Sequence, residues 1–279
     1  MIARMMGFSA TRVVSMAGLV PDAAKPWGSL PREQIEWLAL AGARGLVLDG
    51  TRDGIRARQL DGSARRAVAS LLRRLDLRFR GIDLWIPAAD FADPATSSRA
   101  IDAACGAIEL CSNLHRLSGD SSISPAVNLS LPRSEEASSV AHAARHAIID
   151  AAARFGARIA DFGPDSREGI ADPDSPLGAG VDPFALLNSG HDPVAILGNL
   201  MAPLHGARER TAGVMVRASR ESNARFDALA YRAALSLRGV VTDAPDQPAS
   251  AGPALVLDLR NEERPQQALL AYWSNPETI

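Results

Sequence analysis

The sequence predicts an α/β fold in which one domain, residues 1–279, forms a (β/α)8 TIM barrel with its fifth helix reduced or missing. The main observation is a recurring unit, in which a short apolar strand stops at an acidic residue and an amphipathic helix follows. Strands that alternate with helices are typical of a parallel sheet covered by helices. The length agrees, because 279 residues suit a barrel that typically needs ~250. No linker interrupts the pattern.

Four such units fill the first half of the chain. The strands are expected at 12–19, 44–50, 78–87 and 125–132, and the helices at 30–42, 63–77, 90–114 and 134–156. Pro31 and Gly42 suit the start and the end of the first helix. Ser63 is the expected N-cap of the second helix. Glu135 and Glu136 lie in the first turn of the fourth helix, where negative charge is favourable.

The second half of the chain is less regular. Strands are expected at 157–165, 176–183 and 254–260, and helices at 192–204, 225–239 and 264–274. Segment 165–176 is rich in Pro, Asp and Ser, which indicates a loop where the fifth helix would lie. Two segments are alternatives for the seventh strand, namely APLHGA at 202–207 and TAGVMVRA at 211–218.

Composition excludes several classes of function. The net charge is −2 and no basic tract is present, so we expect no nucleic-acid partner. No apolar run reaches the length of a membrane span, so we expect no membrane partner. Cys105 and Cys111 lie on different faces of one predicted helix, which indicates free thiols and a reducing cytoplasm. Lys25 is the only lysine, so Schiff-base chemistry would depend on that residue alone.

Candidate functional residues lie at the ends of the predicted strands. The candidate metal ligands are Asp161, Asp182, His205 and Asp258. Barrels of this kind keep their chemistry at these strand ends. Carboxylates with one imidazole suit a divalent metal such as Mn2+, Mg2+ or Zn2+. Such a cation can stabilise an enediolate while carboxylates move a proton between carbons. Trp85 and Arg260 are the candidate substrate-binding residues, because an aromatic ring at a strand end can wall a sugar pocket.

The last strand allows a prediction about side-chain direction. Ala254, Val256 and Asp258 share one side of the strand, and three leucines share the other. The leucines are the bulkier apolar set and suit the helix layer. Asp258 is therefore expected to face the barrel axis.

Three segments carry a resemblance to a known family. GAGVDPFALLNSGHDPVAIL at 178–197, SRAIDAACGAIELCSNL at 98–114 and the helix-then-strand close at 225–260 resemble xylose isomerase-like sugar phosphate isomerase/epimerase barrels. The resemblance implies a metal-dependent isomerase or epimerase of carbohydrate metabolism. It assigns ligand roles, strand by strand, to Asp161, Asp182, His205 and Asp258. It also implies that Asp161 and Asp258 are the catalytic acid/base pair.

The sequence departs from the family pattern, and each candidate also has a structural interpretation. Two aspartates replace the family's glutamates, and the usual His after the sixth-strand Asp is absent. Asp182 precedes a proline, as turn formers and caps often do. Asp258 could pair with Arg260, and Asp161 could cap the turn that follows it. His205 is a lone histidine, which is more often structural than a ligand.

Three functions therefore remain open. The first is a divalent-metal-dependent sugar or sugar phosphate isomerase/epimerase that acts through an enediolate. The second is a non-catalytic, metal-free barrel that serves as a binding or scaffold protein, which the departures favour. The third, an apurinic endonuclease, is disfavoured because it needs a richer His/Glu cluster and a DNA-binding surface. The expected partner is a small polar, sugar-like substrate, and assembly into a homo-oligomer stays open.

Overall fold

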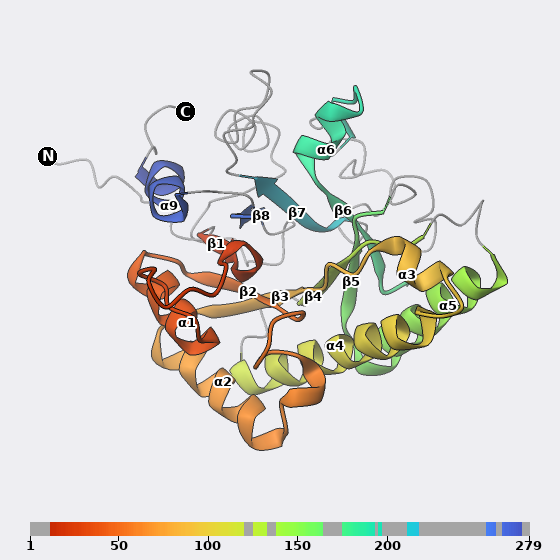
Figure 1. The fold of residues 1–279 in the computed structure, drawn as a ribbon, viewed down its shortest axis with the longest axis horizontal. Coiled ribbons are helices and arrows are strands. Elements are labelled where there is room, and N and C mark those ends of the chain that lie inside the picture. Colours follow the sequence, from red (N-terminus) through yellow and green to blue (C-terminus); the bar gives the residue numbers. More distant parts are fainter. Residues whose placement is uncertain are drawn as a thin grey trace, which may run out of the picture.

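Parallel strands form the centre of the structure, a computed structural model that describes residues 12–119, 125–132, 138–163, 175–192, 195–196, 211–217, 255–260 and 264–274. The strands are β1 Val13–Ser15, β2 Gly45–Asp49, β3 Arg78–Asp83, β4 Ala126–Leu129, β5 Arg158–Asp161, β6 Leu177–Val181, β7 Thr211–Arg217 and β8 Leu255–Asp258. Each strand pairs in parallel with the next, and β8 also pairs with β1, so the sheet closes (Figure 1). The predicted α/β fold with a parallel sheet is confirmed.

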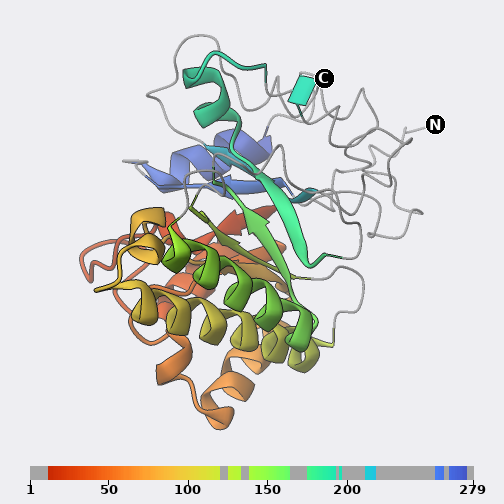
Figure 2. The same cartoon turned by 90° about the vertical axis from the view of Figure 1, so that its right-hand side faces the viewer.

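Helices cover the outside of the sheet. They are α1 Pro31–Leu40, α2 Gly62–Arg74, α3 Ala88–Ala92, α4 Ser97–Ser118, α5 Ser139–Phe155, α6 Pro183–Asn188 and α9 Pro265–Ser274, with short 3-10 turns η1 Met16–Gly18 and η2 Ala57–Gln59. Figures 1 and 2 show α1, α2, α4 and α5 along the side formed by the first five strands, with α4 packed against α5. The first half of the chain thus follows the predicted alternation.

Two helices begin at residues other than those predicted. The N-cap of α2 is Asp61 and not Ser63, because the Asp61 carboxylate accepts a hydrogen bond from Ala64 N at 2.8 Å. Helix α5 begins at Ser139 and not near Ser134, and the Ser138 hydroxyl accepts from Ala141 N at 3.3 Å. In both cases a side chain that satisfies an otherwise unpaired amide sets the start of the helix.

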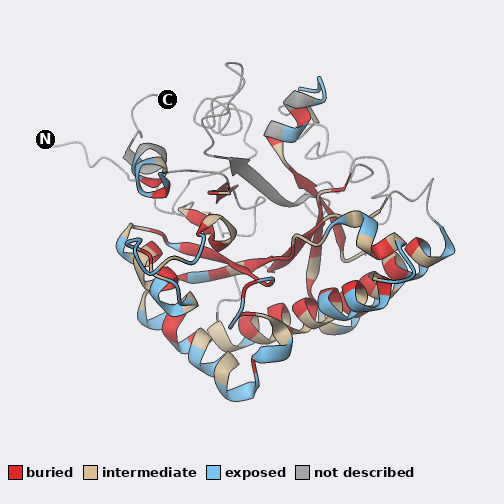
Figure 3. Ribbon diagram, in the orientation of Figure 1, coloured by how far each residue is buried: buried red, intermediate tan, exposed pale blue. Residues whose placement is uncertain are grey.

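Side chains along the strands alternate between two apolar clusters. The larger cluster lies between strands and helices and includes Leu48, Ile82 and Leu257. Figure 3 shows β2 and its neighbours β1 and β3 mostly in the red of buried residues. The smaller cluster contains Val13, Val47 and Val256, with Trp85 and Phe162 packed on it. Since β1, β2 and β8 contribute its valines, this cluster fills the inside of the barrel. The predicted side-chain alternation of β8 is therefore confirmed.

Two glycines allow close approaches that shape the C-terminal end of the barrel. A Cβ on Gly180 of β6 would lie 2.4 Å from the Phe162 ring, so the absence of a side chain leaves room for that ring inside. A Cβ on Gly18 would lie 2.1 Å from the backbone carbonyl carbon of Leu259. The turn after β1 therefore touches the residue that follows β8, and the two ends of the sheet meet closely.

The seventh strand is the second of the two predicted alternatives, TAGVMVRA. His205 precedes this strand and lies outside the described residues, as does segment 164–174, where the fifth helix was expected to be reduced or missing. Cys105 and Cys111 are free thiols, as predicted. Among the described helices, none combines the length and the apolar character that crossing a bilayer requires.

Candidate functional site

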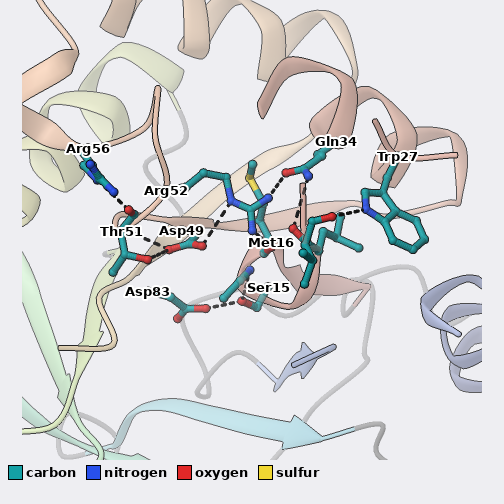
Figure 4. Close-up of polar contacts among 12 residues, drawn as sticks. Ser15, Met16, Trp27, Gln34, Asp49, Thr51, Arg52, Arg56 and Asp83 are labelled. Atoms are coloured by element: carbon teal, nitrogen blue, oxygen red, sulfur yellow. Dashed lines mark hydrogen bonds and ion pairs between the residues drawn. The ribbon is translucent and has the colours of Figure 1, made fainter. Parts of the chain in front are cut away.

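Polar side chains enter the barrel from the C-terminal ends of β1, β3 and β4. The Ser15 hydroxyl donates a hydrogen bond to Asp83 Oδ2, and Asn128 Nδ2 donates to Asp83 Oδ1 at 2.5 Å (Figure 4 shows the Ser15 contact). Strand β2 separates β1 from β3, so the contact between Ser15 and Asp83 crosses the barrel interior. Asp83 is fully buried. These three residues form a polar layer above the valine cluster.

The environment of Asp83 changes its acidity. Burial raises the pKa of Asp83 from its ordinary 3.8 to about 7, because a charged carboxylate is poorly solvated there. The hydrogen bonds from Ser15 and Asn128 oppose this rise in pKa, the charge of Asp258 adds to it, and the charge of Arg260 opposes it. Near neutral pH, Asp83 can therefore both release and accept a proton, as a general acid/base must.

Asp258 holds Arg260 beside this layer. Arg260 Nε lies 3.0 Å and 2.9 Å from the two Asp258 oxygens, and Nη2 lies 2.7 Å from Oδ2. The Arg260 backbone N also donates to Asp258 Oδ1 at 2.9 Å. Burial alone would lower the pKa of Arg260, but hydrogen bonds and charge from Asp258, with the charges of Asp83 and Asp182, raise it overall. The guanidinium is therefore a permanent cation.

An aromatic wall completes the cluster. The Arg260 guanidinium carbon lies 4.0 Å from the centroid of the Trp85 ring, a cation–π geometry. Trp85 meets Phe162 edge to face, with the ring centroids 5.3 Å apart. Trp85 follows β3, Phe162 follows β5 and Arg260 follows β8, so the three side chains meet across the mouth. The two predicted substrate-binding residues, Trp85 and Arg260, are thus brought together.

Asp161 lies apart from this cluster. It shares its side of β5 with Ile159, which belongs to the outer apolar cluster. Its Oδ1 accepts from Leu131 N at 3.0 Å and Gly163 N at 2.8 Å, and its Oδ2 lies 3.5 Å from Arg145 Nη1 of α5. Burial raises the pKa of Asp161, and these contacts oppose the rise. Its carboxylate thus closes the turn after β5 and is not turned toward Asp258.

Asp182 caps a helix and also faces the charged cluster. Its Oδ1 accepts from Ala185 N at 3.2 Å at the start of α6, and its charge contributes to the raised pKa of Arg260. The fourth predicted ligand, His205, is outside the described residues.

The described donors do not fit a divalent cation. Asp161 is turned outward, and both oxygens of Asp258 accept hydrogen bonds from Arg260. Within the ranges that the structure describes, no three His, Cys, Asp or Glu side chains are arranged to hold a metal ion. Metal binding by the full predicted set stays a prediction, because His205 lies outside the described residues.

A second network of hydrogen bonds connects the loops that follow β1 and β2 (Figure 4). Asp49 accepts from Thr51 N at 3.0 Å, from Thr51 Oγ1 at 2.6 Å and from Arg52 Nε at 3.4 Å. Arg52 also donates to Gln34 Oε1 and, at 3.4 Å, to Met16 O. Burial lowers the pKa of Arg52, and Asp49 opposes that effect. The network ties α1 to two loops and so stiffens one side of the mouth.

Sequence reasoning did not include Ser15, Asp83 or Asn128 among the site residues. The available signal was their position in apolar strands. Ile82 and Leu84 point to the outer cluster, so Asp83 between them must point inward. Val127 and Leu129 give the same result for Asn128. The same rule, that a strand residue between two outward-facing apolar residues points inward, predicted the direction of Asp258. Applied to every strand, it would have found Ser15, Asp83 and Asn128.

Comparison with solved structures identifies the fold. A xylose isomerase domain protein from Planctomyces limnophilus superposes with a TM-score of 0.59 at 12% identity, covering 94% of this chain and 93% of that one. A sugar phosphate isomerase/epimerase from Parabacteroides distasonis gives 0.60 at 11%, covering 95% and 93%. The 3-keto-D-glucoside 4-epimerase from E. coli gives 0.60 at 12%, covering 95% and 99%.

No protein-family model matches the chain, and no curated protein matches it in sequence. The structural similarity therefore shows a xylose isomerase-like fold, as the sequence resemblance implied. At these identities the similarity concerns the fold alone.

Proposed function

We propose that this chain is a (β/α)8 barrel of the xylose isomerase-like superfamily and acts on a small, polar, sugar-like substrate. The proposed reaction is isomerisation or epimerisation by proton transfer at a carbon next to a carbonyl. One observation carries the proposal: Asp83, with a pKa raised to about 7, is buried inside the C-terminal end of this fold, within reach of the charges of the Asp258–Arg260 pair. A carboxyl of that acidity next to a fixed cation suits proton abstraction.

In the proposed reaction Asp83, Arg260 and Trp85 have separate roles. Asp83 takes the proton from the carbon, and the electron pair of that bond moves onto the carbonyl oxygen to give an enediolate. The Arg260 guanidinium stabilises the negative charge on that oxygen. Return of the proton by Asp83 to the neighbouring carbon, while the hydroxyl proton moves between the two oxygens, exchanges ketose and aldose. Inversion of the original carbon requires a second proton donor on the opposite face of the enediolate, because Asp83 reaches only one face. Trp85 offers an apolar face for the substrate's C–H groups.

No step of this reaction passes through a metal. The resemblance implies a divalent cation on Asp161, Asp182, His205 and Asp258, but Asp161 is turned outward to Arg145 and both oxygens of Asp258 accept hydrogen bonds from Arg260. Of the two predicted catalytic residues, Asp258 keeps a role because it fixes Arg260 in place. We assign the acid/base role to Asp83, which faces the barrel interior, and not to Asp161, which is turned outward.

Hydrogen–deuterium exchange tests the proposal directly. The protein is incubated in D2O with a panel of ketoses and aldoses, with EDTA or with Mn2+, and NMR follows loss of the C–H signal next to the carbonyl. We expect exchange by the parent and a loss of at least about 100-fold in Asp83→Asn. Asp161→Asn is the matched control, because it removes a buried carboxylate outside the mouth. Exchange at the parental rate by Asp83→Asn, or no exchange with any sugar, would reject the proposal.

A non-catalytic sugar-binding barrel is the second candidate function. The observation that favours it is that the carboxylates of Asp161 and Asp258 are already engaged by arginines. In that case the same panel would show saturable binding by calorimetry, with no deuterium exchange in any condition.

A further inference from the structure

We infer that the Arg260 guanidinium is the fixed cation of this mouth, in the role that the resemblance gives to a divalent metal. It binds Asp258 and experiences the charges of Asp83 and Asp182, so it neutralises carboxylates that would otherwise attract a metal ion. The catalytic meaning of this inference rests on the proposed function, whereas its binding test does not.

Three contacts define the position of Arg260, and two of them involve the Asp258 carboxylate. Asp258 engages Nε and Nη2, the backbone N of Arg260 donates to the same carboxylate, and the Trp85 ring packs on the guanidinium face. Asp258 is fully buried, so its ion pair with Arg260 is poorly screened by water. A cation held in this way needs little reorganisation when charge develops nearby.

Part of the guanidinium remains available to a ligand. The hydrogen bonds of the Arg260 side chain in the described structure use Nε and Nη2 and leave Nη1 uncommitted. The side chain is 26% exposed, in contrast to 0% for Asp258. A planar pair of oxygens, as in an enediolate, matches the fork of N–H donors that a guanidinium presents.

The same geometry opposes metal binding at Asp258. Both of its oxygens accept hydrogen bonds from Arg260, so a divalent cation would have to displace the guanidinium from its carboxylate and from Trp85. Arginine stays protonated at every physiological pH. The site therefore carries its own positive charge.

The test measures binding of glycolohydroxamate, a small planar mimic of an enediolate, by calorimetry in EDTA and then in Mn2+. We expect the parent to bind the hydroxamate in EDTA and Mn2+ to add nothing. Arg260→Met should weaken binding roughly 10- to 100-fold, and Arg260→Lys should lose less. Arg154→Met is the matched control, because Arg154 also packs on an aromatic ring, that of Phe155, at 4.7 Å, but on α5.

A double variant keeps the test informative. Arg260→Met leaves Asp258 buried without its cation and could disturb folding, which thermal unfolding would show. Asp258→Asn with Arg260→Met removes both charges, and this variant should fold and still fail to bind the hydroxamate. Binding that requires Mn2+, no binding by the parent, or equal affinity in the double variant would overturn the inference. If no sugar exchanges deuterium but Arg260→Met loses hydroxamate binding, the proposed function fails and the inference stands.

Discussion

Arg145 of α5 and Asp161 of β5 form an ion pair on the outer side of the barrel, with Nη1 and Oδ2 3.5 Å apart. The Asp161 side chain is 2% exposed and that of Arg145 17%, so water screens the pair little. The same carboxylate accepts two backbone hydrogen bonds. Asp161 therefore connects a helix, a strand and a turn, and its contacts account for a buried acid without any catalytic role.

Replacement of Asp161 should affect stability and spare the mouth. Asp161→Ala leaves two amides and the Arg145 guanidinium without their acceptor, and we expect a loss of about 2–4 kcal/mol in unfolding free energy. Asp161→Asn keeps one acceptor oxygen and should lose less. Urea unfolding measures both variants. A variant with parental stability but without hydroxamate binding would instead place Asp161 in the site.

The pKa of Asp83 predicts how stability depends on pH. Because the folded protein binds this proton with a pKa of about 7, against an ordinary value of 3.8, stability falls as pH rises between these values and then levels off. The full effect is on the order of 4–5 kcal/mol, since each tenfold change in proton affinity is about 1.4 kcal/mol. Urea unfolding of the parent and of Asp83→Asn from pH 4 to 8 should show this slope in the parent and less of it in the variant. Parallel curves would show that Asp83 has no such raised pKa.

The packing of Phe162 against Gly180 predicts a coupled pair of mutations. Gly180→Ala would place a methyl group 2.4 Å from the Phe162 ring, so the ring must move and we expect a cost of about 1–3 kcal/mol. Phe162→Leu should reduce the cost of Gly180→Ala, because a smaller side chain leaves room for the methyl group. A double-mutant cycle by chemical denaturation measures this coupling. Strictly additive energies would mean that the two positions do not compete for the same space.

Asp182 offers a clean test of the metal prediction. Asparagine is as good an N-cap as aspartate, so Asp182→Asn should preserve the start of α6 while removing one negative charge near Arg260. We expect Mn2+ titration by calorimetry to give the same weak or absent binding in both proteins. Tight Mn2+ binding by the parent, weakened in Asp182→Asn, would restore the ligand role and contradict a metal-free mouth.

The alternation of side chains explains both the success and the failure of the site prediction. In β8 Leu257 packs outward and Val256 packs inward, so Asp258, on the same side of the strand as Val256, turns inward as predicted. In β5 the bulky residue is Ile159, which shares its side with Asp161, so the same rule would have turned Asp161 outward. The contact between Trp85 and Arg260 could not be predicted, because it joins segments that are far apart in the sequence and three strands apart around the closed sheet. The seventh strand stayed ambiguous because two short apolar segments fitted one place.

The close approach of Gly18 to Leu259 has a consequence for biosynthesis. Strand β1 leaves the ribosome before the other described strands, but its partner β8 emerges after all of them. Throughout that interval β1 presents an unpaired edge, which nascent chains must keep from other strands. The positive charge of Arg260, which lowers the pKa of Asp83, is likewise added only when the segment after β8 has been made. The sheet therefore closes, and Arg260 joins the charged cluster, in the same folding step, which can occur only after β8 has been made.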